Sequence, residues 1–231
     1  MAKRSVRTPL GGGRDDRQLD DHSSDLWDPR LGEVARRLLT SAVRCFATNG
    51  YHGTTTRDIS SGVGLSPAAM YVHFPSKELV LYEIVRAGHE RALAHVEGPG
   101  TQPGDDPTAR LHRMMARYTA WHARHHVAAR VCQYEYTALT AAHFGEVAAL
   151  RHRTNQAFRA AVADGVAEGC FVALDVNRVV RAMLSLSIDL VRWYRLDGSD
   201  SPERLGQFYA DLALTMVARP DAAERLAAGA P

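Results

Sequence analysis

Residues 55–77 read TTRDISSGVGLSPAAMYVHFPSK, and this stretch decides the fold of the N-terminal part of the chain. Thr55 with Asp58 three residues later has the pattern of a capping box, which starts a short helix. Ser66-Pro67 starts a second short helix that reaches about Phe74, because serine caps a helix and proline suits its first position. The glycines between the two helices predict a tight turn, and this arrangement is the outline of a helix-turn-helix.

The residue types along this stretch suit contact with DNA. In a helix-turn-helix the second helix lies in the major groove, and the first braces it across the backbone. Threonine hydroxyls at a helix start favour phosphate, small residues let the second helix approach base edges, and an alanine methyl contacts a thymine methyl. Tyr71 and His73 add polar donors, and the Lys77 ammonium is expected to contact a phosphate. The predicted DNA-binding residues are Thr55, Thr56, Arg57, Ser66, Pro67, Ala68, Ala69, Tyr71, His73 and Lys77.

A longer amphipathic helix precedes this motif. We expect it to start at Asp28-Pro29, a cap followed by a proline, and to end at Asn49-Gly50. Apolar residues between these points recur at the spacing of one helix face. Residues 1–27 are predicted to be a disordered tail, since they have three consecutive glycines, mixed charges and almost no periodic apolar positions. The helix-turn-helix domain therefore spans residues 28–76.

The sequence after this domain is also predicted to be helical. A long helix from Lys77 to about Glu97 is followed by a proline- and glycine-rich loop over residues 98–107. Further helices are expected over residues 111–122, 127–140, 145–168, 175–195 and 201–218. No run of alternating strand-type residues is convincing. The predicted fold is all-α, with a second helical domain over 77–219 and a short tail over 220–231.

Composition places the chain among ordinary globular proteins and excludes several classes. It has 231 residues, 45% of them hydrophobic, and a net charge of +2, so neither a fibre nor a disordered chain is expected. Three cysteines, an odd number and far apart, argue against a disulfide framework or a zinc ribbon. No signal peptide or membrane helix is visible, so we expect a soluble cytoplasmic protein. The motifs of serine hydrolases, zinc proteases and phosphate-binding loops are missing, so neither an enzyme nor a cofactor is expected.

The block from Leu31 to Leu79 resembles the N-terminal domain of the TetR family of bacterial transcriptional regulators. The matching residues are Ala35, Ala42, Phe46, Gly50, Tyr51, Thr55, Arg57, Asp58, Ile59, Gly64, Leu65, Ser66, Tyr71, His73, Phe74, Ser76, Lys77 and Glu78. The resemblance implies a repressor that acts as a homodimer, in which each recognition helix reads one half of a near-palindromic operator. Pro67-Ala68-Ala69 is less polar than the recognition-helix start of many members, which favours methyl contacts and DNA shape over base hydrogen bonds.

The same resemblance assigns roles to the second domain. Effector pockets in the family lie between the helices after the linker, and the last two long helices pair with those of a second copy as a four-helix bundle. The residues expected to bind effector are Met115, Tyr118, His122, Tyr134, Phe158, Met183, Leu186 and Trp193. The residues expected at the dimer interface are Leu190, Tyr194, Leu205, Phe208, Tyr209, Leu212 and Met216.

A second resemblance concerns the effector. Positions in the C-terminal half follow the pattern of TetR-type repressors that control lipid and steroid catabolism and sense acyl-CoA thioesters. They are Glu135, Leu139, Leu150, Arg151, Gly165, Gly169, Phe171, Asp175, Trp193, Tyr194, Gly198, Pro202 and Tyr209. The effector is therefore expected to be an acyl-CoA thioester or another hydrophobic small molecule. For a thioester, Arg151 or Arg195 would pair with the CoA phosphates.

The alternative hypothesis is a metal-responsive regulator. It would use the region of His112, His122 and His126, because the last two have the spacing of metal ligands on one helix. No cysteine or carboxylate obviously completes the ligand shell in the sequence. Scattered histidines without a metal are therefore the favoured interpretation.

Overall fold

The computed structural model describes residues 23–172 and 175–218. Within these ranges the regular structure is helical, apart from one isolated β-bridge between Phe171 and Ala218, so the predicted all-α fold is confirmed. The α-helices are α1 (Glu33–Gly53), α2 (Thr56–Ser61), α3 (Pro67–His73), α4 (Lys77–Val96), α5 (Pro107–Arg124), α6 (His126–Tyr134), α7 (Ala141–Ala167), α8 (Val176–Asp189) and α9 (Pro202–Val217). The 3-10 helices are η2 (Ser23–Leu26), η3 (Tyr136–Ala138) and η4 (Leu190–Arg192).

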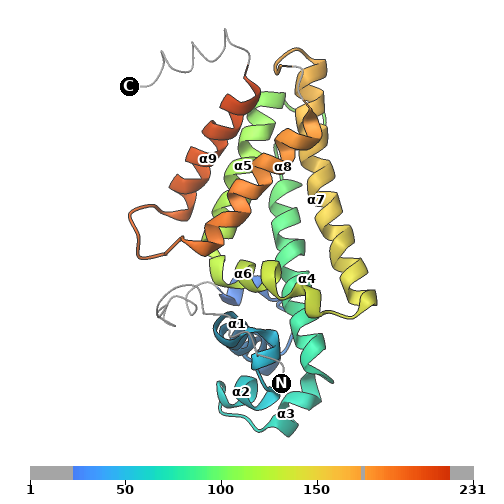
Figure 1. The fold of residues 1–231 in the computed structure, drawn as a ribbon, viewed down its shortest axis with the longest axis vertical. Helices are drawn as coiled ribbons and strands as arrows, with labels where there is room; N and C mark the ends of the chain where they lie inside the picture. The colour runs from blue at the N-terminus through green and yellow to red at the C-terminus, as the bar shows by residue number, and fades with distance from the viewer. Residues whose placement is uncertain (1–22, 173–174, 219–231) are drawn as a thin grey trace, which may run out of the picture.

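Helices α1, α2 and α3 gather at one end of the molecule, and we call this unit the head (Figure 1). Its apolar residues come from all three helices: Phe46 of α1, Ile59 of α2 and Met70 of α3 are fully buried. Helix α4 leaves the head and continues into the second helical bundle, where it packs against α5, α6 and α7 (Figure 1). One continuous helix therefore connects the head to the bundle.

In the second bundle, α5 and α9 approach each other closely. Gly206 of α9 lies against the backbone of Ala116 in α5, and a Cβ at Gly206 would overlap the Ala116 carbonyl oxygen. The same Cβ would lie 3.2 Å from the Ala120 Cβ. Only glycine fits between the two helices at this point.

The N-terminal boundary differs from the prediction. Part of the predicted disordered tail is ordered, because Leu26 and Trp27 are each only 3% exposed and the Trp27 indole N–H donates to the Thr40 hydroxyl at 2.9 Å. Asp28-Pro29 forms a turn instead of a helix cap, since the Asp28 carboxylate binds Arg30, and α1 begins only at Glu33. The remainder of that tail, at 1–22, and the predicted tail at 220–231 lie outside the described residues.

Two predicted helices are shorter than expected. The helix expected to reach residue 195 ends at Asp189 and tightens into η4, where the backbone N–H groups of Trp193 and Tyr194 both donate to the Leu190 carbonyl. The helix expected over 127–140 likewise ends at Tyr134 and is followed by η3. Such tight turns bind the last carbonyls of a helix, and apolar periodicity does not reveal them. No helix in the described part of the chain has the length and hydropathy needed to cross a bilayer.

Candidate DNA-binding surface and effector cavity

Helix α2 is fixed by the predicted capping box. The Thr55 hydroxyl accepts from the Asp58 backbone N–H at 3.1 Å, and the Asp58 carboxylate accepts from the Thr55 backbone N–H at 2.8 Å. The hydroxyl also donates to this carboxylate at 2.7 Å, and these hydrogen bonds lower the pKa of Asp58. The Thr55 hydroxyl thus serves the cap, which corrects its predicted role as a phosphate ligand. Thr56 and Arg57 stand at the start of α2 and remain accessible to solvent.

A glycine turn sets α2 and α3 against α1. Gly64 has a φ of +73°, in the left-handed region that suits glycine. The Ser41 hydroxyl of α1 donates to the Ile59 carbonyl at 2.8 Å in a buried position. A Cβ at Gly62 would overlap the Ser41 hydroxyl oxygen, so this position also requires glycine. The angle between the two short helices is therefore determined jointly by the glycines and by α1.

Helix α3 presents one face to solvent. It begins at the predicted cap, where the Ser66 hydroxyl accepts from the Ala69 backbone N–H at 3.3 Å and Pro67 is the first helical residue. Met70 is buried beneath the helix and joins the core of the head. The residues of α3 with exposed side chains are Ala68, Tyr71, Val72 and His73. This face is mainly apolar, as the small residues at the helix start predict.

Val72 is the most accessible apolar side chain on this face, with 81% of its surface exposed. It follows Tyr71, which is 50% exposed, and lies one helical turn after Ala68. A branched methyl pair in this position suits contact with a thymine methyl in the major groove. Val72 is not among the residues predicted from the sequence, because a valine in a short helix is typical of a core. Its spacing of four residues from Ala68 is the signal that could have identified it.

The Lys77 ammonium has partners inside the protein, which corrects its predicted role as a phosphate ligand. Its Nζ donates to the Tyr51 carbonyl at 2.7 Å and to the Thr54 carbonyl at 2.6 Å. It also lies 4.2 Å from the centre of the Tyr51 ring. Burial lowers the pKa of Lys77. The ammonium is drawn inward because the turn before α2 offers it two carbonyl oxygens that no helix satisfies.

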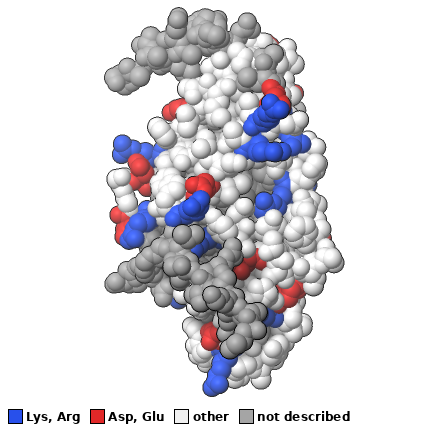
Figure 2. Space-filling model, viewed as in Figure 1, with Lys and Arg blue, Asp and Glu red and all other residues white. Residues whose placement is uncertain are grey.

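Charges of both signs are mixed over the surface. Figure 2 shows Lys and Arg side chains scattered among Asp and Glu on the visible face, without a large patch of one sign. This agrees with the net charge of +2. Contact with a polyanion would therefore depend on a few side chains at the head rather than on a broad basic field.

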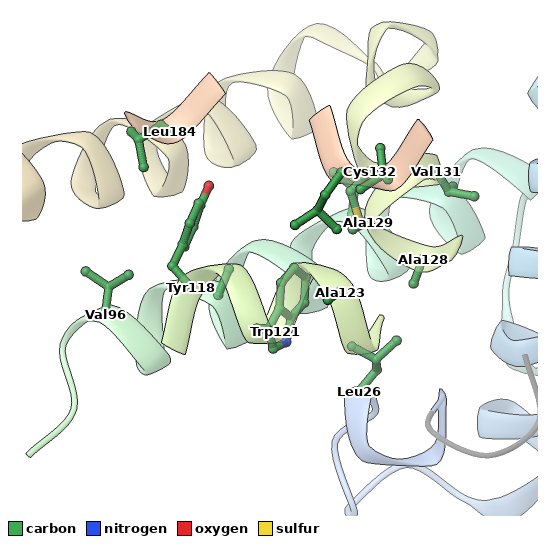
Figure 3. Packing of buried hydrophobic residues seen from close by; sticks show 14 of the residues in the cluster. Leu26, Val96, Tyr118, Trp121, Ala123, Ala128, Ala129, Val131, Cys132 and Leu184 are labelled. Carbon is green, nitrogen blue, oxygen red and sulfur yellow. The ribbon is translucent and has the colours of Figure 1, made fainter. Parts of the chain in front are cut away.

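A cavity of about 180 Å³ lies in the second bundle between α4, α5, α6, α7 and α8. In Figure 3, Tyr118 of α5 reaches toward the helix that carries Leu184. The cavity is lined by Gly88, His89, Ala92, Tyr118, Trp121, His122, Ala129, Cys132, Gln133, Arg151, Thr154, Asn155, Arg181, Leu184, Ser185 and Ile188. Aromatic and aliphatic surface is thus combined with several polar groups, as is usual in sites for small molecules.

Only two of the residues predicted to bind effector, Tyr118 and His122, line this cavity. Three others belong to the closed core, because Met115, Phe158 and Met183 are almost completely buried. The remaining three, Tyr134, Leu186 and Trp193, have exposed side chains outside the cavity. The prediction is wrong for these six residues, because apolar spacing does not tell which side of a helix faces a cavity and which faces the core. The contribution of α4, including His89, has no counterpart in the prediction.

The cavity wall is cationic. Arg151 and Arg181 both line it, and no Asp or Glu does so in the described part of the chain. The Arg151 guanidinium donates to the Gln133 side-chain oxygen at 3.3 Å and lies 4.9 Å from the centre of the Tyr136 ring. Arginine without a carboxylate partner in a partly closed site favours an anionic ligand group. Arg195, the other arginine considered for this role, forms an ion pair with Asp197 at the surface.

Two buried histidines add hydrogen-bonding groups to the cavity. Burial lowers the pKa of His89 to about 3 and that of His122 to about 4, so both rings are neutral at physiological pH. His122 Nδ1 lies 2.8 Å from the Tyr118 carbonyl oxygen, so this nitrogen must carry the proton and Nε2 is left as an acceptor. His89 Nε2 is buried and has no hydrogen-bond partner among the described residues. A ligand that offers a polar atom to His89 would remove this deficit.

The metal-responsive alternative gains no support. His112 Nε2 lies 3.0 Å from an Asp211 carboxylate oxygen, and His126 Nδ1 lies 3.1 Å from the Ala123 carbonyl oxygen. His122 faces the cavity instead. No group of three His, Cys, Asp or Glu side chains placed to hold a metal ion occurs within residues 23–172 and 175–218. The histidine cluster in the sequence is therefore not a cluster in space.

Helices α8 and α9 carry an exposed apolar face, but it differs from the predicted set. Phe208 is 62% exposed and Leu212 is also exposed, whereas Tyr209 and Met216 are half-buried. The other predicted interface residues, Leu190, Tyr194 and Leu205, are buried within the same protomer. The prediction is wrong for these three because η4 turns them toward the protomer's own core. Leu186 and Trp193, assigned to effector from the sequence, are exposed apolar residues of this region.

The two parts of the chain each match a known family. Residues 38–84 match the bacterial regulatory proteins of the tetR family, and residues 104–217 match the tetracyclin repressor-like C-terminal domain. The chain is similar to the transcriptional repressor KstR2 of Mycolicibacterium smegmatis, with 31% identity over 77% of this chain and 87% of the relative. It also resembles the structure of the ketosteroid transcriptional regulator KstR2 of Mycobacterium tuberculosis, with a TM-score of 0.76, 26% identity and coverage of 82% of this chain and 97% of that one.

A more distant structure shares the fold. It is AibR in complex with isovaleryl coenzyme A and operator DNA, with a TM-score of 0.68, 20% identity and coverage of 78% of this chain and 97% of that one. Together with the capped helix pair α2–α3 and its exposed face, the matches over both domains leave no place for an enzyme. The chain belongs to the TetR family and is a DNA-binding transcriptional repressor.

Proposed function

We propose that this repressor binds a near-palindromic operator as a homodimer in the cytoplasm and is released by a hydrophobic small molecule with an anionic group. The observation that carries the proposal is the continuous helix α4. Its first residue, Lys77, contacts the head, and its residues Gly88, His89 and Ala92 line the cavity. A ligand in the cavity therefore touches the same helix that supports the reading face of α3.

The α8–α9 region supports the homodimer. Its exposed apolar residues include Leu186, Trp193, Phe208 and Leu212, and large apolar patches are uncommon on the surface of a monomer. A two-fold dimer would place two copies of α3 about one DNA turn apart, roughly 34 Å, which matches the half-sites of a palindrome. We assign operator contact to the solvent-facing residues at the starts of α2 and α3 and along α3. They are Thr56, Arg57, Ser66, Pro67, Ala68, Ala69, Tyr71, Val72 and His73.

The chemistry of the cavity supports an acyl-CoA thioester as effector. Tyr118 and Trp121 offer apolar surface for an acyl group, and Arg151 and Arg181 offer charge for an anionic group. A cavity of about 180 Å³ is smaller than pockets that enclose a drug-sized ligand, which start at about 300 Å³. It would hold the acyl end of a thioester, and the nucleotide would extend past the arginines. Another hydrophobic anion of similar size, such as a free fatty acid, is the second candidate.

The first experiment measures operator release. Fluorescence anisotropy would follow the protein on DNA from upstream of its own gene while acyl-CoA thioesters, the matching free acids and CoA are added. We expect at least one thioester to release the DNA at a concentration where its free acid and CoA do not. Release by the free acid alone would assign the effector to the second candidate, and tight binding that no compound disturbs would contradict both.

Replacing His122 with phenylalanine is expected to weaken the releasing compound by about 5- to 10-fold, because a hydrogen bond in a closed site contributes roughly 1 kcal/mol. Phenylalanine keeps the volume and apolar surface of the ring but lacks the Nε2 acceptor. Isothermal titration of the compound into each protein, without DNA, measures the change. His152→Phe on α7 is the matched control, since His152 is exposed and does not line the cavity. Equal affinity of wild type and His122→Phe would show that His122 only fills space.

A further inference from the structure

The segment between α1 and α2 is the point where the head meets the second bundle. Gly50 leaves the helical conformation, with φ +71° and ψ 167°, and Thr55 caps α2. Between them, the Thr54 hydroxyl donates to the carbonyls of Gly50 at 2.8 Å and Cys45 at 3.0 Å. We call residues 50–54 the hinge turn. Its internal hydrogen bonds make it stiff, so a displacement of the turn must carry the start of α2 with it.

One residue of the second bundle reaches the hinge turn from α6. The Glu135 carboxylate accepts from the Tyr51 backbone N–H at 2.8 Å, across 84 positions of sequence. Glu135 is the C-terminal cap of α6, and the two residues Cys132 and Gln133 just before it line the cavity. A Cβ at Gly50 would lie 3.7 Å from the nearest Glu135 carboxylate oxygen, so the carboxylate packs directly on the glycine backbone.

A second residue reaches the same turn from α4. Lys77 Nζ donates to the Tyr51 and Thr54 carbonyls, and its position at the start of α4 ties this helix to the turn. His89, which lines the cavity, lies on the same helix about 18 Å further along. An acidic group on a free N–H and a basic group on two free carbonyls thus hold one short backbone segment from two different cavity walls.

We propose that Glu135 and Lys77 are positioning residues that set the orientation of the α2–α3 pair through the hinge turn. When α4 and α6 change their separation around an occupied cavity, the two sets of hydrogen bonds cannot both keep their geometry. The turn then follows one wall, and α2 with α3 turns relative to the rest of the dimer. The part of the proposal that concerns the occupied cavity rests on the function proposed above, whereas the positioning of the head does not.

The first test needs no effector. Operator affinity and its salt dependence would be measured for Lys77→Met, which keeps the aliphatic stem but removes the donors. We expect affinity to fall by about 10-fold with the slope of log K against log salt unchanged, because a lost phosphate contact would reduce that slope by about 1. A slope reduced by that amount would place the ammonium on DNA and overturn its positioning role. Unchanged affinity would overturn it as well.

Glu135 is tested by Glu135→Ala and Glu135→Gln. The amide keeps an acceptor oxygen for the Tyr51 N–H, so Gln is expected to restore most of the affinity that Ala loses, about 10-fold, because a charge-assisted bond to a backbone N–H is stronger than a neutral one. Glu97→Ala is the control, since Glu97 is a surface carboxylate that pairs with Arg153. If Ala and Gln bind the operator as tightly as wild type, Glu135 has no positioning role.

The second test measures coupling. The ratio of operator affinities with and without the releasing thioester is expected to fall toward 1 in Glu135→Ala, while direct binding of the thioester in calorimetry stays unchanged. An unchanged ratio would refute the link to the cavity. If no compound releases the wild type, the effector proposal fails and the first test still decides the positioning role. Should Glu135→Ala not fold, hydrogen exchange of residues 51–58 in the wild type decides the link, since thioester should accelerate it and equal protection would contradict it.

Discussion

An Ala68→Glu variant is expected to lose at least about 100-fold in operator affinity, which corresponds to roughly 3 kcal/mol. Ala68 is exposed near the start of α3, on the face that also carries Val72. A carboxylate here would lie against base edges and between phosphates, and placing like charges together in an interface costs several kcal/mol. The alanine is small, so its replacement also prevents close approach of the helix to the groove. A filter or anisotropy titration with the wild-type operator measures the loss.

Two companion variants make this result specific. Ala160→Glu places the same charge on an exposed position of α7, and it should leave operator affinity within about twofold, as surface substitutions usually do. Ala68→Leu should instead change which base pairs are preferred in a randomised operator library, because a larger apolar side chain alters the methyl contacts. If Ala68→Glu bound the operator normally, α3 would not be the helix in the major groove.

A Gly206→Ala variant is expected to lower the free energy of unfolding by about 3 kcal/mol, the upper end of the usual cost of overpacking a core. The new methyl would overlap the Ala116 carbonyl oxygen and approach the Ala120 Cβ to 3.2 Å, so α5 and α9 must separate. On a free helix surface alanine is more favourable than glycine by about 1 kcal/mol, which means that the clash alone determines the sign. Thermal unfolding should show a decrease of roughly 10 °C in Tm.

Gly145→Ala is the matched control for this prediction. Gly145 is inside α7 and an added Cβ would meet nothing within 4 Å, so the change is expected to raise stability by about 0.5 to 1 kcal/mol. Opposite signs for the same substitution in two helices would show that the close packing of α5 on α9 exists in solution. Stabilisation by Gly206→Ala would show that the two helices lie further apart than in this structure.

Much of the head is encoded in short stretches of sequence. The Thr55–Asp58 capping box, the Ser66-Pro67 start of α3 and the end of the regular helix at Gly50 are all confirmed. Each depends on hydrogen bonds or backbone conformations within about four residues. The order of the buried tryptophan before α1 could not be predicted in this way. Trp27 is stabilised by Thr40, and no periodic pattern surrounds it.

The cavity could be predicted only in part. Tyr118 and His122 lie on a stripe of α5 that does face the cavity, but Met115 on the same helix packs into the core. The two sides are both apolar, so the sequence offers no way to tell them apart. His89 escaped prediction because it belongs to α4, which the sequence presents as a connection to the head. Its neighbours in the cavity come from segments about 30 to 100 positions away.

The sequence by itself determined that this chain is an all-helical TetR repressor with a capped α2–α3 pair, because capping, periodicity and glycine turns act over a few neighbouring residues. The tertiary structure alone decided where the charged groups of Lys77, Glu135 and Arg151 are directed. It also decided which apolar residues of α8 and α9 are buried in the protomer and which remain on its surface. The physical reason is that a side chain's partner is chosen by proximity in space, and these partners come from helices far apart in the chain.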